Sequence, residues 1–137
     1  MSTKVEGGCY CKAIRYEISV EPMLNLQCHC RECQYISGGN ANVCMVIPGD
    51  GFKYTQGTPR QFARKDLENP VTREFCGECG TPLLSRSPAI PGAAIIKRGT
   101  FDDPKAFGAP QMAIFTIDRQ PYQYVPDGMP AFERMPG

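Results

Sequence analysis

Tryptophan is missing from this sequence, histidine occurs once, and no long run of apolar or basic residues is present. Apolar residues make up 42% and charged residues 21%, a balance that excludes a disordered chain and a membrane-spanning one. No stretch approaches the roughly 20 apolar residues that cross a bilayer as a helix. We therefore expect a folded protein that has no membrane partner.

The lack of basic clusters argues against a nucleic-acid partner. The 15 lysines and arginines nearly balance 14 acidic residues, and the formal net charge is +1. Non-specific binding to nucleic acid needs dense Lys and Arg to neutralise phosphates. We therefore expect no nucleic-acid partner.

Residues 1–8 also lack the apolar stretch of a secretory signal peptide, so we expect a cytoplasmic protein. Thiols stay reduced in that compartment. The eight cysteines are therefore interpreted as metal ligands rather than as a disulfide framework.

Short alternating runs, punctuated by 14 glycines and 13 prolines, fill the chain, and no long amphipathic helix is visible. Residues 13–20 form the clearest run, with four apolar side chains on one face. The pattern predicts a mainly β fold, and the length predicts one domain over residues 1–137. A helical turn is expected at residues 31–36, ended by Gly38. Further strands are expected at 23–27, 42–47, 52–56, 61–64, 71–75, 81–85, 93–98, 113–117 and 122–125.

The densest motif is a C-x-C-x-x-C run formed by Cys28, Cys30 and Cys33. Thiolates are soft, strong zinc ligands, and this spacing lets one tight turn direct several sulfurs at one ion. Three thiolates leave one tetrahedral position open for water or substrate. The motif therefore predicts a reactive zinc site.

Four other cysteines form two knuckles, Cys9-x-Cys11 and Cys76-x-x-Cys79. Four thiolates close a tetrahedral zinc site and leave no position for chemistry. Zinc at this site would join the N-terminal strand to the middle of the chain. The second set therefore predicts a structural zinc.

Two side chains could close the three-cysteine site. His29 lies between two ligands, where neighbouring side chains point apart, so a role beside the metal or as a general base competes with ligation. Cys44 lies in an apolar run, where a lone cysteine is more often part of the core.

An open site on three thiolates would favour one kind of chemistry. Three thiolates on Zn²⁺ leave a net negative charge, which makes the metal a weak Lewis acid but suits capture of a soft thiol as thiolate. A thiolate can add to a small electrophilic carbonyl, or the adduct can collapse in reverse. Lys12, Arg15 or Arg31 could attract the carboxylates of a thiol substrate, or could be ordinary surface charges.

The chain resembles the glutathione-dependent formaldehyde-activating enzyme family, whose members share a domain with centromere protein V. The matching motifs are GGCYC at residues 7–11, IRY at 14–16, CHCRECQ at 28–34 and FCGECGTPL at 75–83. The resemblance implies a β-tent fold like that of Rab-exchange-factor-type zinc proteins. It also implies a carbon–sulfur lyase that forms or cleaves S-hydroxymethylglutathione, with a glutathione-like thiol as partner. The implied ligands are Cys9, Cys11, Cys76 and Cys79 for structural zinc, and Cys28, Cys30 and Cys33 for catalytic zinc.

The sequence departs from the family pattern at three places. Lys12 follows the second cysteine, where a glycine is usual. Gln111 follows Pro110 in a region where relatives usually carry a histidine after a proline, and the usual tryptophan is absent. Tyr122 or Tyr124 is the candidate for the packing place of that tryptophan.

Three functions therefore compete: a zinc-dependent lyase acting on a thiol adduct, a non-catalytic zinc-stabilised protein-binding module, and a redox-sensing thiol cluster. The open coordination position discriminates between the first two. The physiological substrate, the occupancy of the second zinc site and the oligomeric state stay open.

Overall fold

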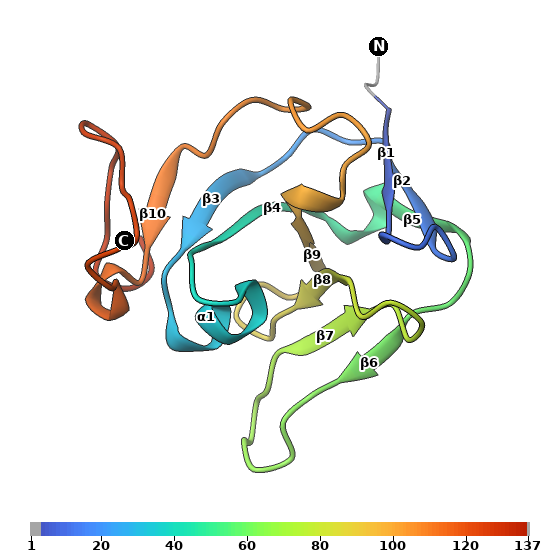
Figure 1. The fold of residues 1–137 in the computed structure, drawn as a ribbon, viewed down its shortest axis with the longest axis horizontal. Helices are drawn as coiled ribbons and strands as arrows, with labels where there is room; N and C mark the ends of the chain where they lie inside the picture. The colour runs from blue at the N-terminus through green and yellow to red at the C-terminus, as the bar shows by residue number, and fades with distance from the viewer. Residues whose placement is uncertain (1–3, 137) are drawn as a thin grey trace.

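A computed structural model describes residues 4–136, which form ten strands in two sheets and one short α-helix (Figure 1). The prediction of a mainly β fold is confirmed. Within these residues, no helix combines the length and the apolar composition that crossing a membrane requires.

The smaller sheet has three antiparallel strands in the order β1-β2-β5. Their bounds are Val5–Gly8, Arg15–Ile18 and Phe52–Gln56. Tyr16 and Ile18 on β2 are almost fully buried, because alternate side chains of a strand share one face.

The larger sheet has seven strands in the order β10-β3-β4-β9-β8-β7-β6. Neighbours are antiparallel except β10 and β3, which run parallel. In that order the bounds are Met112–Ile114, Leu24–Cys28, Asn42–Pro48, Ala93–Lys97, Pro82–Arg86, Thr72–Phe75 and Arg60–Phe62. Single 3-10 turns occur at Gly49–Gly51, Arg98–Thr100 and Thr116–Asp118.

The only helix among the described residues, α1, spans Arg31–Ser37 and joins β3 to β4. Cys30 caps its start, since the Cys30 sulfur accepts from the backbone N–H of Cys33. Gly38 ends it in the left-handed region at φ 84°, where glycine carries no steric penalty. The predicted helical turn ended by Gly38 is therefore confirmed.

Two apolar clusters form the core. The larger one joins the two sheets, since it contains Tyr16 of β2 together with Ile47, Leu84 and Ile96 of the larger sheet. The smaller one contains three cysteines beside aliphatic residues of the β3 end of that sheet. Its buried members are Leu26, Cys28, Cys33, Cys44, Val46, Ala93 and Ile114.

The strand predicted at residues 122–125 is wrong. These residues form an irregular turn in which Tyr122 and Tyr124 are 69% and 73% exposed, so neither packs in the core as a tryptophan would. The fully buried side chain is the polar Gln123 between them. Gln123 is buried because its side chain hydrogen-bonds to His29 and to the backbone carbonyl of Gly39.

Candidate metal centres

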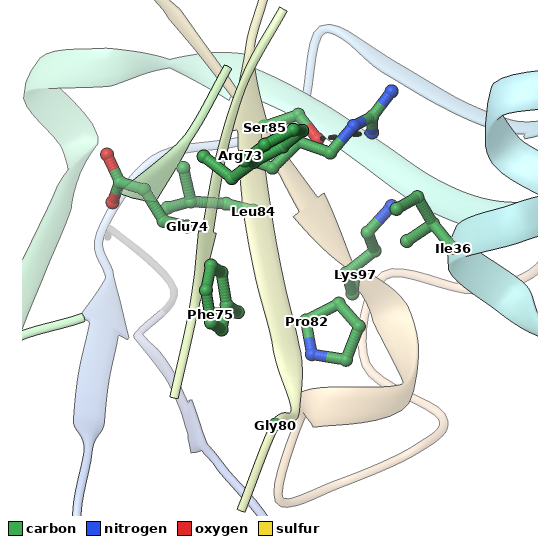
Figure 2. Close-up of a pocket in the computed structure, with 10 residues that line it drawn as sticks. Ile36, Arg73, Glu74, Phe75, Gly80, Pro82, Leu84, Ser85 and Lys97 are labelled. Carbon is green, nitrogen blue, oxygen red and sulfur yellow. Dashed lines mark hydrogen bonds between the residues drawn. The ribbon is translucent and has the colours of Figure 1, made fainter. Parts of the chain in front are cut away.

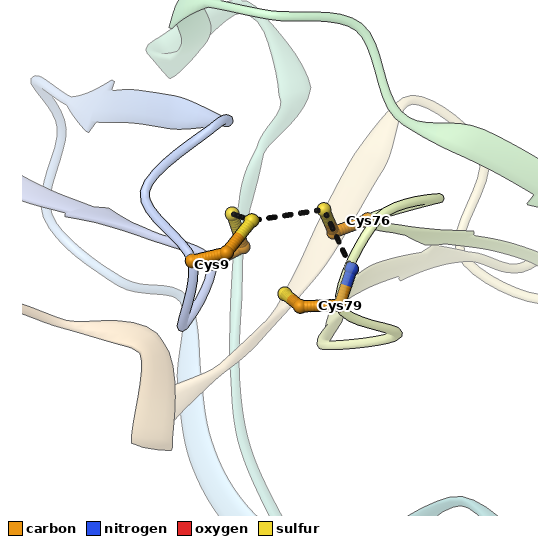
Figure 3. Close-up of side chains that lie close together, drawn as sticks. Cys9, Cys76 and Cys79 are labelled. Carbon is orange, nitrogen blue, oxygen red and sulfur yellow. Dashed lines mark hydrogen bonds between the residues drawn. The ribbon is translucent and has the colours of Figure 1, made fainter.

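The four-cysteine group lies where the two sheets meet. Cys9 and Cys11 come from the turn after β1, and Cys76 and Cys79 come from the turn between β7 and β8. Figure 3 shows Cys9 beside Cys76 and Cys79. The Sγ atoms of Cys9 and Cys11 are 3.6 Å apart, and those of Cys11 and Cys76 are 3.8 Å apart. All four sulfurs lie within 4.8 Å of one another.

This geometry fits a tetrahedral metal ion. Zinc–sulfur bonds of about 2.3 Å place tetrahedral sulfurs about 3.8 Å apart, which matches the two distances above. Backbone N–H groups support the thiolates: Ile14 donates to Cys9 at 3.2 Å, and Glu78 donates to Cys76 at 3.4 Å. A hydrogen bond with the Thr81 side chain lowers the pKa of Cys79 to about 6, which favours the ligating thiolate.

Lys12 in the first of these turns explains one departure from the family pattern. Its backbone adopts φ 69°, the left-handed region that glycine occupies without strain. The turn around the second cysteine therefore requires this conformation, and in this chain a lysine adopts it.

The three-cysteine group lies at the junction of β3 and α1. Cys28 is the last residue of β3, Cys30 caps α1, and Cys33 lies in the first turn of the helix. Their sulfurs lie within 4.8 Å of one another. Cys28 and Cys33 are buried, and Cys30 is partly exposed. The Asn42 side-chain amide, 3.7 Å from the Cys33 sulfur, is placed to donate to it.

The sulfurs of this group influence one another's ionisation. The thiols of Cys28 and Cys33 lower the pKa of Cys30, and hydrogen bonding to Cys30 raises the pKa of Cys28. The Cys30 thiol thus loses its proton readily, whereas the neighbouring thiols resist losing theirs, because adjacent thiolates repel each other. All three can ionise together only beside a positive ion, so the donor set fits a bound metal.

His29 does not complete the group. It is fully buried, with Nδ1 2.8 Å from Gln123 Oε1 and Nε2 3.0 Å from Gln27 Nε2. The Gln27 amide nitrogen can only donate, so His29 Nε2 accepts and Nδ1–H donates to Gln123. Both ring nitrogens therefore take part in hydrogen bonds, and neither is available to bind a metal or to accept a proton from a substrate.

Cys44 also lies outside the group. Burial raises the pKa of its thiol to about 12, which keeps it neutral. It packs in the smaller apolar cluster, as the core interpretation predicts. Within residues 4–136 the group thus holds three ligand atoms, and a tetrahedral ion on it would have one position free.

Two of the three predicted substrate cations are engaged in other contacts. Arg15 pairs with Asp102, and the Arg31 guanidinium lies over the Tyr35 ring at 5.2 Å. Lys12 belongs to the turn of the four-cysteine group. A fourth cation, Lys97, was not among the predicted site residues, and it lines a cavity of about 300 Å³ (Figure 2). Its only signal was a lysine at the end of an apolar strand.

The fold and the sites define a class: a mainly β protein with one four-thiol and one three-thiol group, both arranged for metal binding. The chain belongs to the glutathione-dependent formaldehyde-activating enzyme family, whose model matches residues 4–118.

Among solved structures, the fold is similar to a crystal structure of a protein from Rhodobacter sphaeroides. The TM-score is 0.61 at 15% identity, over 77% of this chain and 96% of that one. No curated protein matches the sequence significantly.

Proposed function

We propose that the protein is a zinc-dependent carbon–sulfur lyase that acts on the adduct of a glutathione-like thiol with a small aldehyde. The proposal rests chiefly on the three-cysteine group, whose described residues leave one tetrahedral position free. Cys28, Cys30 and Cys33 would hold the catalytic zinc, and Cys9, Cys11, Cys76 and Cys79 the structural zinc. A cytoplasmic location, where glutathione is abundant and thiols are reduced, belongs to the same proposal.

The reaction is an addition and its reverse. The thiol sulfur adds to the aldehyde carbon, the carbonyl π electrons move to oxygen, and the thiol proton ends on that oxygen. Cleavage reverses these steps and returns thiol and aldehyde. Zinc, when bound, would lower the pKa of the incoming thiol so that it is held as thiolate at neutral pH.

The residues around the three-cysteine group determine from which side a substrate can approach it. Leu26, Ile114 and Val46 pack in the same apolar cluster and limit the access of water from the β3 side. Cys30 is the partly exposed ligand, so substrate would approach from its side. Asn42 is placed to hold the Cys33 sulfur in orientation.

Zinc stoichiometry and X-ray absorption test the proposal. We expect two zinc ions in the wild type, the second with three sulfurs and one light atom that glutathione replaces with a fourth sulfur. Cys30→Ser should weaken binding of the second zinc and abolish turnover of S-hydroxymethylglutathione.

Cys44→Ser is the matched control, because Cys44 is buried nearby but lies outside the group. It should keep both zinc ions and the response to glutathione. A second zinc that already has four protein ligands and does not respond to thiol would overturn the lyase and favour a binding module.

A further inference from the structure

The cavity with Lys97 lies on one face of β7, β8 and β9, and Ile36 of α1 lines one side (Figure 2). At about 300 Å³ it is at the lower end of the range for small-molecule sites. Most of its wall is apolar. The lining residues that matter here are Ile36, Phe62, Arg73, Pro82, Ser85 and Lys97.

Lys97 ends β9 inside this wall. It is only 9% exposed, and within residues 4–136 its Nζ has no hydrogen-bond partner. A buried ammonium group without a partner is costly, so proteins normally provide an opposite charge or a ligand. Burial lowers the pKa of Lys97, and the nearby thiols of Cys44 and Cys33 partly offset that effect.

A second cation lies beside it. Arg73 points to the same side of the sheet as Lys97, whereas Glu74 points the opposite way (Figure 2). Arg73 donates to Ser85 Oγ at 3.4 Å and forms an ion pair with Glu32 at 2.8 Å. The Glu32 side chain is 46% exposed, so this pair lies at the rim, and Glu32 pairs with Arg73 rather than with Lys97.

Glu74 is the one acidic residue among those that line the cavity, but its carboxylate points to the other side of the sheet (Figure 2). Glu74 accepts hydrogen bonds from Tyr54, Gln61 and Arg86, each within 3.0 Å. It is therefore unavailable to Lys97. The described residues thus offer Lys97 no carboxylate, so the anion that balances it is either a thiolate of the nearby cysteines or a carboxylate of a ligand.

The cavity adjoins the three-cysteine group. Cys33 and Ile36 are three residues apart on α1, a spacing that puts both on one helix face. Cys44 lies directly opposite Lys97 across the β4–β9 pair, and it packs in the same cluster as Cys28 and Cys33. A ligand with a thiol at one end and a carboxylate a few bonds away could therefore reach both places.

We propose that Lys97, assisted by Arg73, binds a carboxylate of the thiol substrate in this cavity. The ligand class is a small thiol that carries a carboxylate, and the cavity selects it over neutral thiols. Binding of the thiol at the metal rests on the proposed function, whereas binding of the carboxylate by Lys97 does not. In this proposal Lys97 contacts the carboxylate of the substrate and takes no part in the reaction at the thiol, so it determines specificity.

The test uses zinc-loaded protein and three matched ligands. These are 3-mercaptopropionate, its neutral analogue 3-mercapto-1-propanol, and the S-methylated acid 3-(methylthio)propionate. Calorimetry gives the dissociation constants for wild type, Lys97→Met, Arg73→Met and the control Lys53→Met, which alters an exposed lysine of β5. Methionine fits the volume of buried Lys97, and zinc content and circular dichroism check the fold.

A charge-assisted contact with a carboxylate should make wild type and Lys53→Met prefer the acid over the alcohol by about tenfold. Lys97→Met should lose that preference without weakening the alcohol, and Arg73→Met should lose part of it. Equal weakening of acid and alcohol by Lys97→Met would overturn the proposal, because Lys97 would then only balance the charge of the cysteines. Absence of any preference in the wild type would overturn it too.

The S-methylated acid has a carboxylate but no free thiol, so it tests the carboxylate site independently of the proposed lyase activity. If thiols do not bind the metal, the proposed lyase activity is wrong. Binding of 3-(methylthio)propionate to wild type, lost in Lys97→Met, would still support the carboxylate site.

Discussion

His29, the only histidine, acts as a buried connection between the three-cysteine turn and the C-terminal segment. Its ring bonds Gln27 on one side and Gln123 on the other, and Gln123 also donates to the Gly39 carbonyl at 3.0 Å. Gln34 adds a further tie, donating to the backbone oxygens of His29 and Asp118 at 2.9 Å and 2.8 Å. Polar side chains from distant parts of the chain thus fix the turn that carries the three cysteines.

This arrangement predicts a structural cost for His29→Leu. The change leaves Gln27 and Gln123 with unpaired groups in the interior, and we expect a loss of about 2–4 kcal/mol in the free energy of unfolding. Denaturant unfolding of the metal-loaded protein measures it, with Gln111→Leu at an exposed position as control. A variant of unchanged stability that binds one zinc fewer would instead identify His29 as a ligand.

At this scale the sequence could predict the cysteine groups but not the residues around them. Short C-x-C and C-x-x-C spacings dictate which sulfurs meet, because each pair comes from one local turn. Gln123 and Lys97 carry no such signal. Their roles depend on burial against strands and turns that are distant in sequence, which local patterns do not report.

Among the elements, β7 carries the best-connected buried carboxylate, Glu74. Its partners Tyr54, Gln61 and Arg86 come from β5, β6 and β8, so one side chain bonds to three other strands of both sheets. Burial opposes ionisation, but these three hydrogen bonds together hold the pKa of Glu74 below its usual value of 4.5. The ionised form is therefore the one that stabilises the fold.

Glu74→Gln should lower the free energy of unfolding by about 2 kcal/mol at neutral pH, because an amide N–H₂ would face the donors Gln61 and Arg86. A depressed pKa gives stability that is present above pH 4.5 and is lost as pH falls through the lower folded value. The difference in the free energy of unfolding between wild type and Glu74→Gln should therefore become smaller below pH 4.5. Unfolding curves of wild type and variant, compared at the same pH and the same zinc content between pH 7 and pH 3, measure this difference, since both proteins release thiolate-bound metal alike as pH falls. A difference in the free energy of unfolding that does not depend on pH would refute the role of the charge.

The elements themselves were predicted where the local pattern agrees with the contacts. Residues 42–47 and 93–98 are mostly apolar, and they form most of β4 and β9 at the centre of the larger sheet, although β9 ends at Lys97. Residues 122–125 have a strand-like alternation but lie between Pro121 and Pro126. Proline restricts the residue before it and removes a ladder donor, so the segment stays a turn despite its pattern.

For the whole molecule, the four-cysteine group joins elements that are distant in sequence. One knuckle belongs to the turn between β1 and β2 of the smaller sheet, and the other to the turn between β7 and β8 of the larger one. The apolar cluster with Tyr16 and Leu84 also crosses this junction. We propose that the metal and the core together make residues 1–137 one cooperative domain.

The two metal groups should therefore differ in what their loss does to the fold. Structural zinc sites contribute on the order of 10 kcal/mol, which is comparable with the whole stability of a domain. If the proposed structural zinc is bound there, Cys76→Ser, at the buried cysteine between the sheets, should lose one zinc and the cooperative thermal transition. Cys79→Ser, at an exposed cysteine, tests the same group with less disturbance of packing, and the thermal transition of this variant should broaden or fall by tens of degrees.

Cys30→Ser should keep a single transition close to that of the wild type, because its group joins only β3 and α1, which are adjacent in sequence. Cys44→Ser, a buried cysteine outside both groups, gives the cost of the substitution itself. Calorimetry with zinc analysis on the four variants decides. Equal destabilisation by Cys79→Ser and Cys30→Ser would contradict the division into one structural and one reactive site, because both groups would then support the fold alike.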